Sequence, residues 1–215
     1  MLVDATGKPE MGAVIGLGAI EAGKHVVMMN VEADVTIGAY LKSEADRLGV
    51  TYSLGAGDEP SAAMELIEFV SAMGHPIVAA GKGTKHHPTY HRSTPDTIWD
   101  HYGLTAEQAA AAGMNSQMFN SFLDGSKPSI ESTAVSNATG LAVPSNGLLY
   151  PPASVEDIPY VTRPQSEGGV LERKGMVEVI SSLETDGRVI PYDIRMGVWV
   201  TVEGETEYIR NCFEE

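Results

Sequence analysis

The fold prediction rests on Leu54-Gly55-Ala56-Gly57-Asp58-Glu59-Pro60 and, further along the chain, on Gly81-Lys82-Gly83-Thr84-Lys85. In the first segment a glycine turn follows a strand-like stretch and delivers Asp58 and Glu59 to the start of a helix pattern. In the second, an apolar run over residues 76–80 ends beside Lys82. Because the carboxyl ends of strands form the ligand-facing edge of an open α/β sheet, we expect these three side chains on one rim. The candidate chemistry is therefore placed there.

Toward the N-terminus, apolar strand patterns alternate with helix patterns. The predicted strands cover residues 2–3, 25–29, 50–54 and 77–80, and the predicted helices cover residues 9–22, 35–48 and 61–73. This alternation is typical of βαβ units, so these residues predict four parallel strands with crossover helices between them. The chain begins with the tail of a strand that has no helix before it. We therefore predict the C-terminal half of a Rossmann-like parallel sheet.

Toward the C-terminus the pattern changes to helices and then to short strands. Helices are predicted from residue 94 to residue 137, and one of them begins with Thr105 as N-cap and Gln108 as its capping-box partner. Residues 141–168 are rich in Pro, Gly, Ser and Asn and predict an irregular connection. Strand patterns at residues 176–180, 189–194 and 198–202 predict a mostly antiparallel sheet. The predicted class is α/β, with a partial Rossmann-like domain in residues 1–85 and an α+β domain in residues 86–215.

The charge and the cysteine content exclude several classes of protein. The chain has 215 residues, with 14 basic against 29 acidic side chains and a formal net charge of −15. This balance disfavours binding to nucleic acid or to an anionic membrane surface. The single Cys212 excludes an internal disulfide framework, and there is neither a secretory leader pattern nor an apolar run of the roughly 20 residues that cross a bilayer. We expect a cytoplasmic protein with a small-molecule partner.

Two glycine motifs resemble nucleotide-binding loops but do not satisfy their requirements. Gly16-Leu17-Gly18 lies inside a helix pattern, and Glu21 stands where the third glycine of a dinucleotide fingerprint belongs. Close packing of helices is the preferred interpretation of these glycines. Gly81-Lys82-Gly83-Thr84 is not a phosphate loop either, because Pro76 occupies the position of its leading glycine.

Asp58, Glu59 and Lys82 each allow two interpretations. Carboxylates at a helix start cap its free N–H groups and interact favourably with its dipole. Two adjacent carboxylates at a glycine turn also offer hard oxygen ligands to a divalent metal, or acceptors to substrate hydroxyls. Lys82 is either a solvated charge at the rim or a donor to a substrate oxygen. The residues alone leave these alternatives open.

Asp124-Gly125-Ser126-Lys127 is the second candidate segment. Lys127 lies four residues before Glu131, so both share a helix face, and one interpretation is a surface ion pair. If this face points into a cleft, Lys127 becomes a proton donor or an oxyanion stabiliser whose pKa depends on burial and on its carboxylate neighbours. Three histidines between residues 86 and 91 share one loop, but no helix or strand fixes their spacing, so no metal site is predicted there.

Several segments occur together in the order known from one protein family. They are Val3-Asp4-Ala5-Thr6-Gly7, Ala22-Gly23-Lys24-His25-Val26-Val27-Met28-Met29-Asn30, Gly55-Ala56-Gly57-Asp58-Glu59-Pro60, Ala80-Gly81-Lys82-Gly83, Asp124-Gly125-Ser126-Lys127 and Asn137-Ala138-Thr139-Gly140. As a set they resemble the homoserine-dehydrogenase-like NAD(P)-dependent oxidoreductases, in particular the deoxyxylulose-phosphate-reductoisomerase-like group. Val31 stands where homoserine dehydrogenases proper carry a lysine, so the resemblance does not imply homoserine chemistry.

The resemblance implies a Rossmann domain followed by a catalytic and oligomerisation domain in a homo-oligomer. It implies hydride transfer between NADP or NAD and a small oxygenated, often phosphorylated substrate, with Mg²⁺ or Mn²⁺ as an optional metal. The implied cofactor-binding residues are Asp4, Ala5, Thr6, Gly7 and Asn30; the implied catalytic residues are Lys82, Lys127, Asp124 and Glu59; the implied metal ligands are Asp58 and Glu59. The N-terminal nucleotide-binding half of family members has no counterpart here, so we expect part of a longer enzyme.

The expected function is therefore that of an NAD(P)H-dependent reductase or reductoisomerase-like enzyme. One alternative belongs to a different class, namely a non-catalytic binding or assembly protein that has kept the sheet and the pocket but lost dinucleotide binding. Another alternative is a sugar-phosphate isomerase or aldolase that uses Lys127 as a Schiff base.

Overall fold

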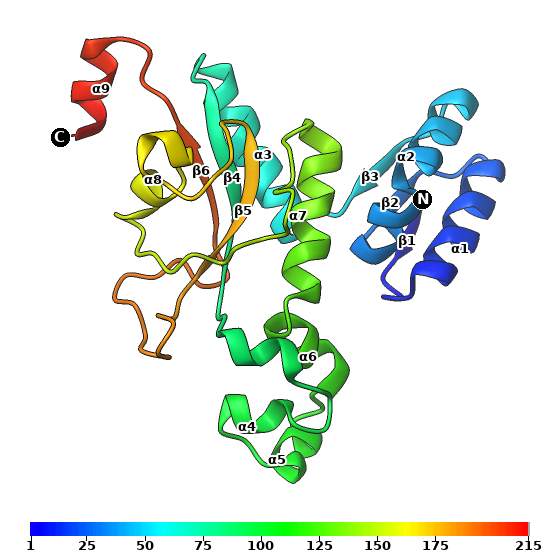
Figure 1. The fold of residues 1–215 in the computed structure, drawn as a ribbon. Coiled ribbons are helices and arrows are strands. Elements are labelled where there is room, and N and C mark those ends of the chain that lie inside the picture. Colours follow the sequence, from blue (N-terminus) through cyan, green and yellow to red (C-terminus); the bar gives the residue numbers. More distant parts are fainter. Residues whose placement is uncertain (215) are drawn as a thin grey trace.

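The computed structural model describes residues 1–214, whose strands form two three-stranded sheets (Figure 1). The first sheet is parallel and has the order β1-β2-β3. It contains β1 (Leu2–Asp4), β2 (Val26–Met28) and β3 (Tyr52–Leu54), connected by α1 (Pro9–Glu21) and α2 (Val31–Leu48). Ile20, Met28 and Leu41 are fully buried where the two helices pack on this sheet. The predicted βαβ units at the N-terminus are confirmed.

The ends and the packing of these helices follow from single residues. The Asn30 side chain caps α2 by accepting a hydrogen bond from Ala33 N at 3.2 Å, and Gly49 ends the helix with a φ of 70°. Gly16 is buried inside α1, where an added Cβ would lie 3.2 Å from Leu41 Cδ1. The expected role of Gly16 in helix packing is therefore confirmed.

Gly12 marks the closest approach of α1 to the first turn of α2. A Cβ at this position would lie 2.5 Å from Ala33 Cβ and 2.7 Å from both Asn30 Nδ2 and Asp4 Oδ2. We therefore expect Gly12→Ala to lower the free energy of unfolding by about 1–3 kcal/mol, the usual cost of overpacking. Chemical denaturation measures this loss.

The matched control is Gly18→Ala in the same helix, where an added Cβ would meet no atom within 4 Å. Replacing a helical glycine by alanine without a clash should raise the free energy of unfolding by up to about 1 kcal/mol. If both variants changed the stability in the same direction, the close approach at Gly12 would be wrong.

The second sheet is mixed and has the order β5-β4-β6. Its central strand β4 (Ile77–Thr84) pairs in parallel with β5 (Met176–Ser181) and antiparallel with β6 (Val198–Val202). The sequence pattern predicts β4 as the fourth strand of the first sheet, and this placement is wrong. Strand and helix alternation identifies β4 as a strand, but its pairing depends on partners that lie far along the chain.

The glycines beside Lys82 let other backbone segments approach β4. A Cβ on Gly81 would overlap with the carbonyl oxygen of Glu178 on β5, and a Cβ on Gly83 would overlap with that of Ile194. The Gly-Lys-Gly motif is therefore explained by strand packing, in agreement with the exclusion of a phosphate loop.

Each face of the second sheet has its own cover. One face packs against α3 (Glu59–Ala72) and α7 (Ser126–Thr139), with Ala63, Ala80 and Val135 in the shared core. The long connection over residues 141–168 packs on the opposite face and contains only the short α8 (Ile158–Val161) and η2 (Gln165–Glu167). The predicted irregular connection is thus confirmed, and its role is to cover the sheet.

The helical segment after β4 forms a separate cluster below the sheet in Figure 1. It contains η1 (Pro88–Arg92), α4 (Ile98–Tyr102), α5 (Ala106–Ala111) and α6 (Ser116–Leu123). The predicted capping box of Thr105 and Gln108 begins α5 and is confirmed. The last helix within residues 1–214 is α9 (Glu207–Glu214).

One predicted strand is wrong. Residues 189–194 contribute a single bridge, between Val189 and Leu183, and then turn. Pro191 has no N–H to donate to a strand ladder, and Tyr192 adopts the left-handed region with a φ of 55°. The α/β class is confirmed, whereas the boundary at residue 85 stays a prediction. No helix within residues 1–214 is both long enough and apolar enough to cross a membrane.

Candidate functional site

Lys82 is the centre of the candidate site. It lies on β4, and only 6% of the residue is exposed. Its Nζ donates hydrogen bonds to Glu59 Oε1 at 3.0 Å and to Glu131 Oε2, so the side chain extends from the sheet toward α3 and α7. A buried ammonium group needs such partners, because an unpaired charge in the interior is costly. Lys82 is thus not a solvated charge at the rim.

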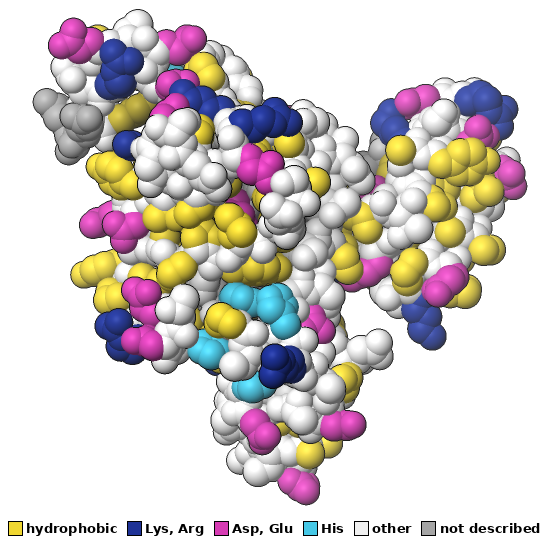
Figure 2. Space-filling model, viewed as in Figure 1, with side chains coloured by type: hydrophobic (Ala, Val, Ile, Leu, Met, Phe, Trp, Pro, Cys, Tyr) yellow, Lys and Arg dark blue, Asp and Glu magenta, His cyan; other side chains and the backbone are white. Residues whose placement is uncertain are grey.

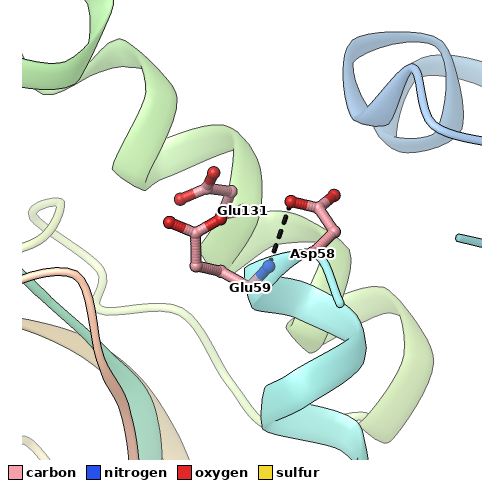
Figure 3. A group of neighbouring side chains, drawn as sticks. All are labelled: Asp58, Glu59 and Glu131. Carbon is pink, nitrogen blue, oxygen red and sulfur yellow. Dashed lines mark hydrogen bonds between the residues drawn. The ribbon is translucent and has the colours of Figure 1, made fainter. Parts of the chain in front are cut away.

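Asp58, Glu59 and Glu131 form a cluster of three carboxylates (Figure 3). Two of them, Glu59 and Glu131, pair with Lys82. One oxygen of each of the three carboxylates lies within 4.8 Å of the others. Asp58 Oδ1 also accepts a hydrogen bond from Glu59 N at 3.0 Å at the start of α3. Asp58 therefore caps α3 as predicted. It also lies close to the carboxylates of Glu59 and Glu131.

Burial and neighbouring charges shift the pKa values of these three carboxyl groups in different directions. Burial raises the pKa of Glu131 to about 7, against the lowering effect of Lys82. Burial raises the pKa of Asp58 as well. Burial acts in the same direction on Glu59, but the Lys82 ammonium group holds the pKa of that carboxyl below its ordinary value. Clustered groups with divergent pKa values are typical of functional sites.

Lys127 reaches the same cluster from the first turn of α7. Its Nζ lies 3.0 Å from Glu32 Oε1 on α2 and 4.0 Å from Glu131 Oε1. Although burial acts to lower the pKa of Lys127, Glu32, Glu131 and Asp58 hold it above its ordinary value, so the side chain is charged at neutral pH. Because Glu131 pairs with both lysines, Lys82 and Lys127 belong to one site.

The site has more carboxylates than ammonium groups. Four carboxylates, including that of Glu32, surround two ammonium groups, which leaves two net negative charges when all are ionised. Carboxylate oxygens are the ligands that Mg²⁺ and Mn²⁺ prefer. Asp58, Glu59 and Glu131 therefore fit a divalent cation in both charge and ligand type.

The raised pKa of Glu131 predicts a pH-dependent affinity for Mn²⁺. Below about pH 7 the cation must displace a proton from Glu131, so the affinity should fall by up to about tenfold per pH unit. It should level off above about pH 8, where Glu131 is ionised. Calorimetric titration with Mn²⁺ at several pH values measures this dependence. If the affinity did not change between about pH 6 and pH 8, Glu131 would not be a ligand of raised pKa.

Asp124 is the C-cap of α6, two residues before α7, and has partners of its own. Its Oδ1 accepts hydrogen bonds from Ser126 N at 2.8 Å and from Ser126 Oγ at 2.6 Å, and its Oδ2 accepts one from Asn120 at 2.8 Å. Within residues 1–214, the ion pairs of Lys82 and Lys127 do not include Asp124. Its carboxylate joins α6 to α7, and its catalytic role stays a prediction.

The predicted cofactor residues lie at the carboxyl ends of β1 and β2. Asn30 Nδ2 donates to Asp4 Oδ2 and Thr6 Oγ1, both at 3.2 Å, and to Lys8 O at 2.8 Å. Asp4 and Asn30 are buried in this network, whereas residues 5–7 are exposed. The exposed turn with its backbone groups is the surface that remains available to a cofactor.

The loop histidines gather between the second sheet and the helices α4 to α6 (Figure 2). The His86 ring stacks on Tyr150 with 4.2 Å between centroids and lies 4.7 Å from the His91 ring. Tyr150 in turn donates a hydrogen bond to Gly125 O at 3.1 Å. Burial lowers the pKa of His86 to about 4, so this ring is neutral. These contacts give the histidines a packing role.

Two residues of the site, Glu131 and Glu32, are not among the predicted catalytic, cofactor-binding or metal-binding residues. Glu131 appears in the sequence only as an ion-pair partner of Lys127, yet it is the most buried carboxylate of the cluster. Glu32 has no local signal at all, because its contact with Lys127 spans 95 positions of the sequence. The spacing of Lys127 and Glu131 places Glu131 on the correct helix face, whereas no spacing rule finds Glu32.

A buried lysine and three convergent carboxylates lie between a sheet and two helices, an arrangement typical of functional sites in α/β proteins. Residues 57–215 match the family model described as the catalytic domain of oxidoreductase DRL, and the chain belongs to this family of oxidoreductases. The match contains Asp58, Glu59, Lys82 and Glu131, whereas β1 to β3 lie before it. No curated protein matches the sequence. The oxidoreductase prediction is confirmed at this general level.

Proposed function

We propose that the protein is an NAD(P)H-dependent reductase or reductoisomerase-like enzyme that acts on a small oxygenated, often phosphorylated substrate. The convergence of three carboxylates and two lysines is the observation that carries the proposal, together with membership of an oxidoreductase family. We further propose a homo-oligomer in the cytoplasm with no nucleic-acid or membrane partner, in line with the acidic composition.

In this proposal Asp58, Glu59 and Glu131 hold a divalent cation such as Mg²⁺ or Mn²⁺. When bound, the cation would polarise a substrate oxygen. Lys82 lies beside the same carboxylates and donates a hydrogen bond to that oxygen, in place of one of its present bonds to Glu59 and Glu131.

Lys127 acts as the proton donor of the proposed reaction. Its raised pKa means that it carries a proton at neutral pH, and it can transfer this proton to an oxygen that becomes negative as hydride arrives at the adjacent carbon. A charged amine is a poor nucleophile, so the same raised pKa disfavours the Schiff-base alternative. The nicotinamide would lie along residues 5–7, next to Asp4 and Asn30.

The experiment that tests the proposal is a titration of NADPH fluorescence with the protein in the presence of Mn²⁺. Saturable binding that is weakened by Lys127→Ala without loss of fold supports a surviving active site. Lys42→Ala is the matched control, because it removes an exposed lysine from α2 that pairs only with Asp46 among the described residues.

The non-catalytic alternative has one observation in its favour. The Asn30 amide and the Asp4 carboxylate already bind one another and the turn after β1, so their hydrogen-bonding groups are occupied without a cofactor. Absence of saturable NADPH binding would favour this alternative and would contradict the proposed enzyme.

A further inference from the structure

We propose that Glu32 is a positioning residue for Lys127. Glu32 lies in the first turn of α2, and its Oε1 is 3.0 Å from the Nζ of Lys127 on α7. The ion pair holds the ammonium group closer to Glu32 than to Glu131, and so limits its competition with a divalent cation for the oxygens of Asp58 and Glu131. The inference rests on the proposed function, because it concerns access to the proposed cation site.

The distances around Lys127 support this role. Its Nζ is 1 Å closer to Glu32 Oε1, at 3.0 Å, than to Glu131 Oε1, at 4.0 Å. Glu131 is almost completely buried, and its other oxygen is held by Lys82. Without Glu32, the remaining carboxylates in reach of Lys127 would be those of Glu131 and Asp58. A lysine that moved onto them would compete directly with a cation.

The ion pair of Glu32 with Lys127 joins α2, which packs on the first sheet, to α7, which packs on the second. Glu32 follows the α2 cap Asn30 by two residues, and the Asn30 side chain binds Asp4 and Thr6 at the end of β1. One end of α2 therefore contacts both the turn proposed to bind the cofactor and, through the ion pair, Lys127 on α7. A carboxylate in the first turn of a helix is favourable by itself, but that role requires no contact with Lys127.

Zero-length cross-linking of the metal-free protein with a carbodiimide tests the contact itself. This reagent joins a carboxylate to an amine that touches it, and mass spectrometry of the digest identifies the pair. We expect mainly a Glu32–Lys127 product in the wild type, and more product of Lys127 with Glu131 or Asp58 in Glu32→Gln. Absence of the first product, or of any gain in the second, would overturn the proposal.

Mn²⁺ binding tests the consequence in a double-mutant cycle. Glu32→Gln should weaken Mn²⁺ binding by about fivefold, the upper range for a partly exposed ion pair, and should have no such effect in a Lys127→Met background. Glu44→Gln removes the same charge from the far end of α2 and should leave the affinity unchanged. An equal loss from Glu32→Gln in both backgrounds would mean that Glu32 acts only through its charge, and would overturn the positioning role.

The two measurements separate this inference from the proposed function. If the wild type bound no Mn²⁺, the cation site of the proposed function would be wrong. The cross-linking pattern would still decide whether Glu32 limits the contact of Lys127 with Glu131 and Asp58.

Discussion

Lys82→Met is expected to lower the free energy of unfolding by about 3–5 kcal/mol at neutral pH, because it leaves a buried carboxylate without its counter-ion. Glu131 loses its main partner inside the protein, and Glu59 loses the group that keeps it ionised. Methionine retains much of the side-chain volume, so the loss of stability would come from the missing charge and not from a cavity. Chemical denaturation measures it.

Added Mn²⁺ should raise the free energy of unfolding of Lys82→Met by more than that of the wild type, since the cation can take the place of the missing ammonium group. The control is Lys42→Met, which breaks an exposed pair with Asp46 on α2 and should cost less than about 1 kcal/mol. A loss as small as that of Lys42→Met would show that Lys82 does not neutralise buried carboxylates.

Glu131→Gln is expected to weaken Mn²⁺ binding by at least about a hundredfold and to abolish NADPH-dependent turnover. Loss of partners outside the ligand sphere already costs about 10–100-fold in metal affinity, so loss of a ligand should reach at least the upper end of that range. The change keeps the size of the side chain but removes the negative charge between Lys82 and Lys127. Calorimetry with Mn²⁺ measures the affinity.

Glu65→Gln is the matched control for Glu131→Gln, because it removes one negative charge from an exposed position on α3. It should change the Mn²⁺ affinity by less than about twofold, as expected for a distant screened charge. If both variants bound Mn²⁺ as the wild type does, the carboxylate cluster would not be a cation site.

Much of the site is predictable because short-range rules place its residues. The glycine turn before Asp58 and Glu59 and the apolar run before Lys82 identify the end of one strand, the start of a helix and a lysine on the next strand. The four-residue spacing of Lys127 and Glu131 predicts their shared helix face. These side chains do meet, although Lys82 belongs to a different sheet from the one predicted.

The rest depends on contacts between distant segments. The pairing of β4 with β5 and β6 joins residues that no local pattern connects, so the sequence assigns β4 to the wrong sheet. The predicted strand at residues 189–194 is interrupted by the backbone conformation at Pro191 and Tyr192. The apolar alternation of these residues is typical of a strand and does not reveal this conformation. Glu32 and the burial of Glu131 follow from how α2, α3 and α7 pack, which spacing along one helix does not reveal.

The most direct test of the site is the position of Mn²⁺ in crystals of the protein, determined from its anomalous scattering. We expect one strong peak bounded by the carboxylates of Asp58, Glu59 and Glu131. A peak at another position, or no peak at these carboxylates in crystals saturated with Mn²⁺, would contradict the account.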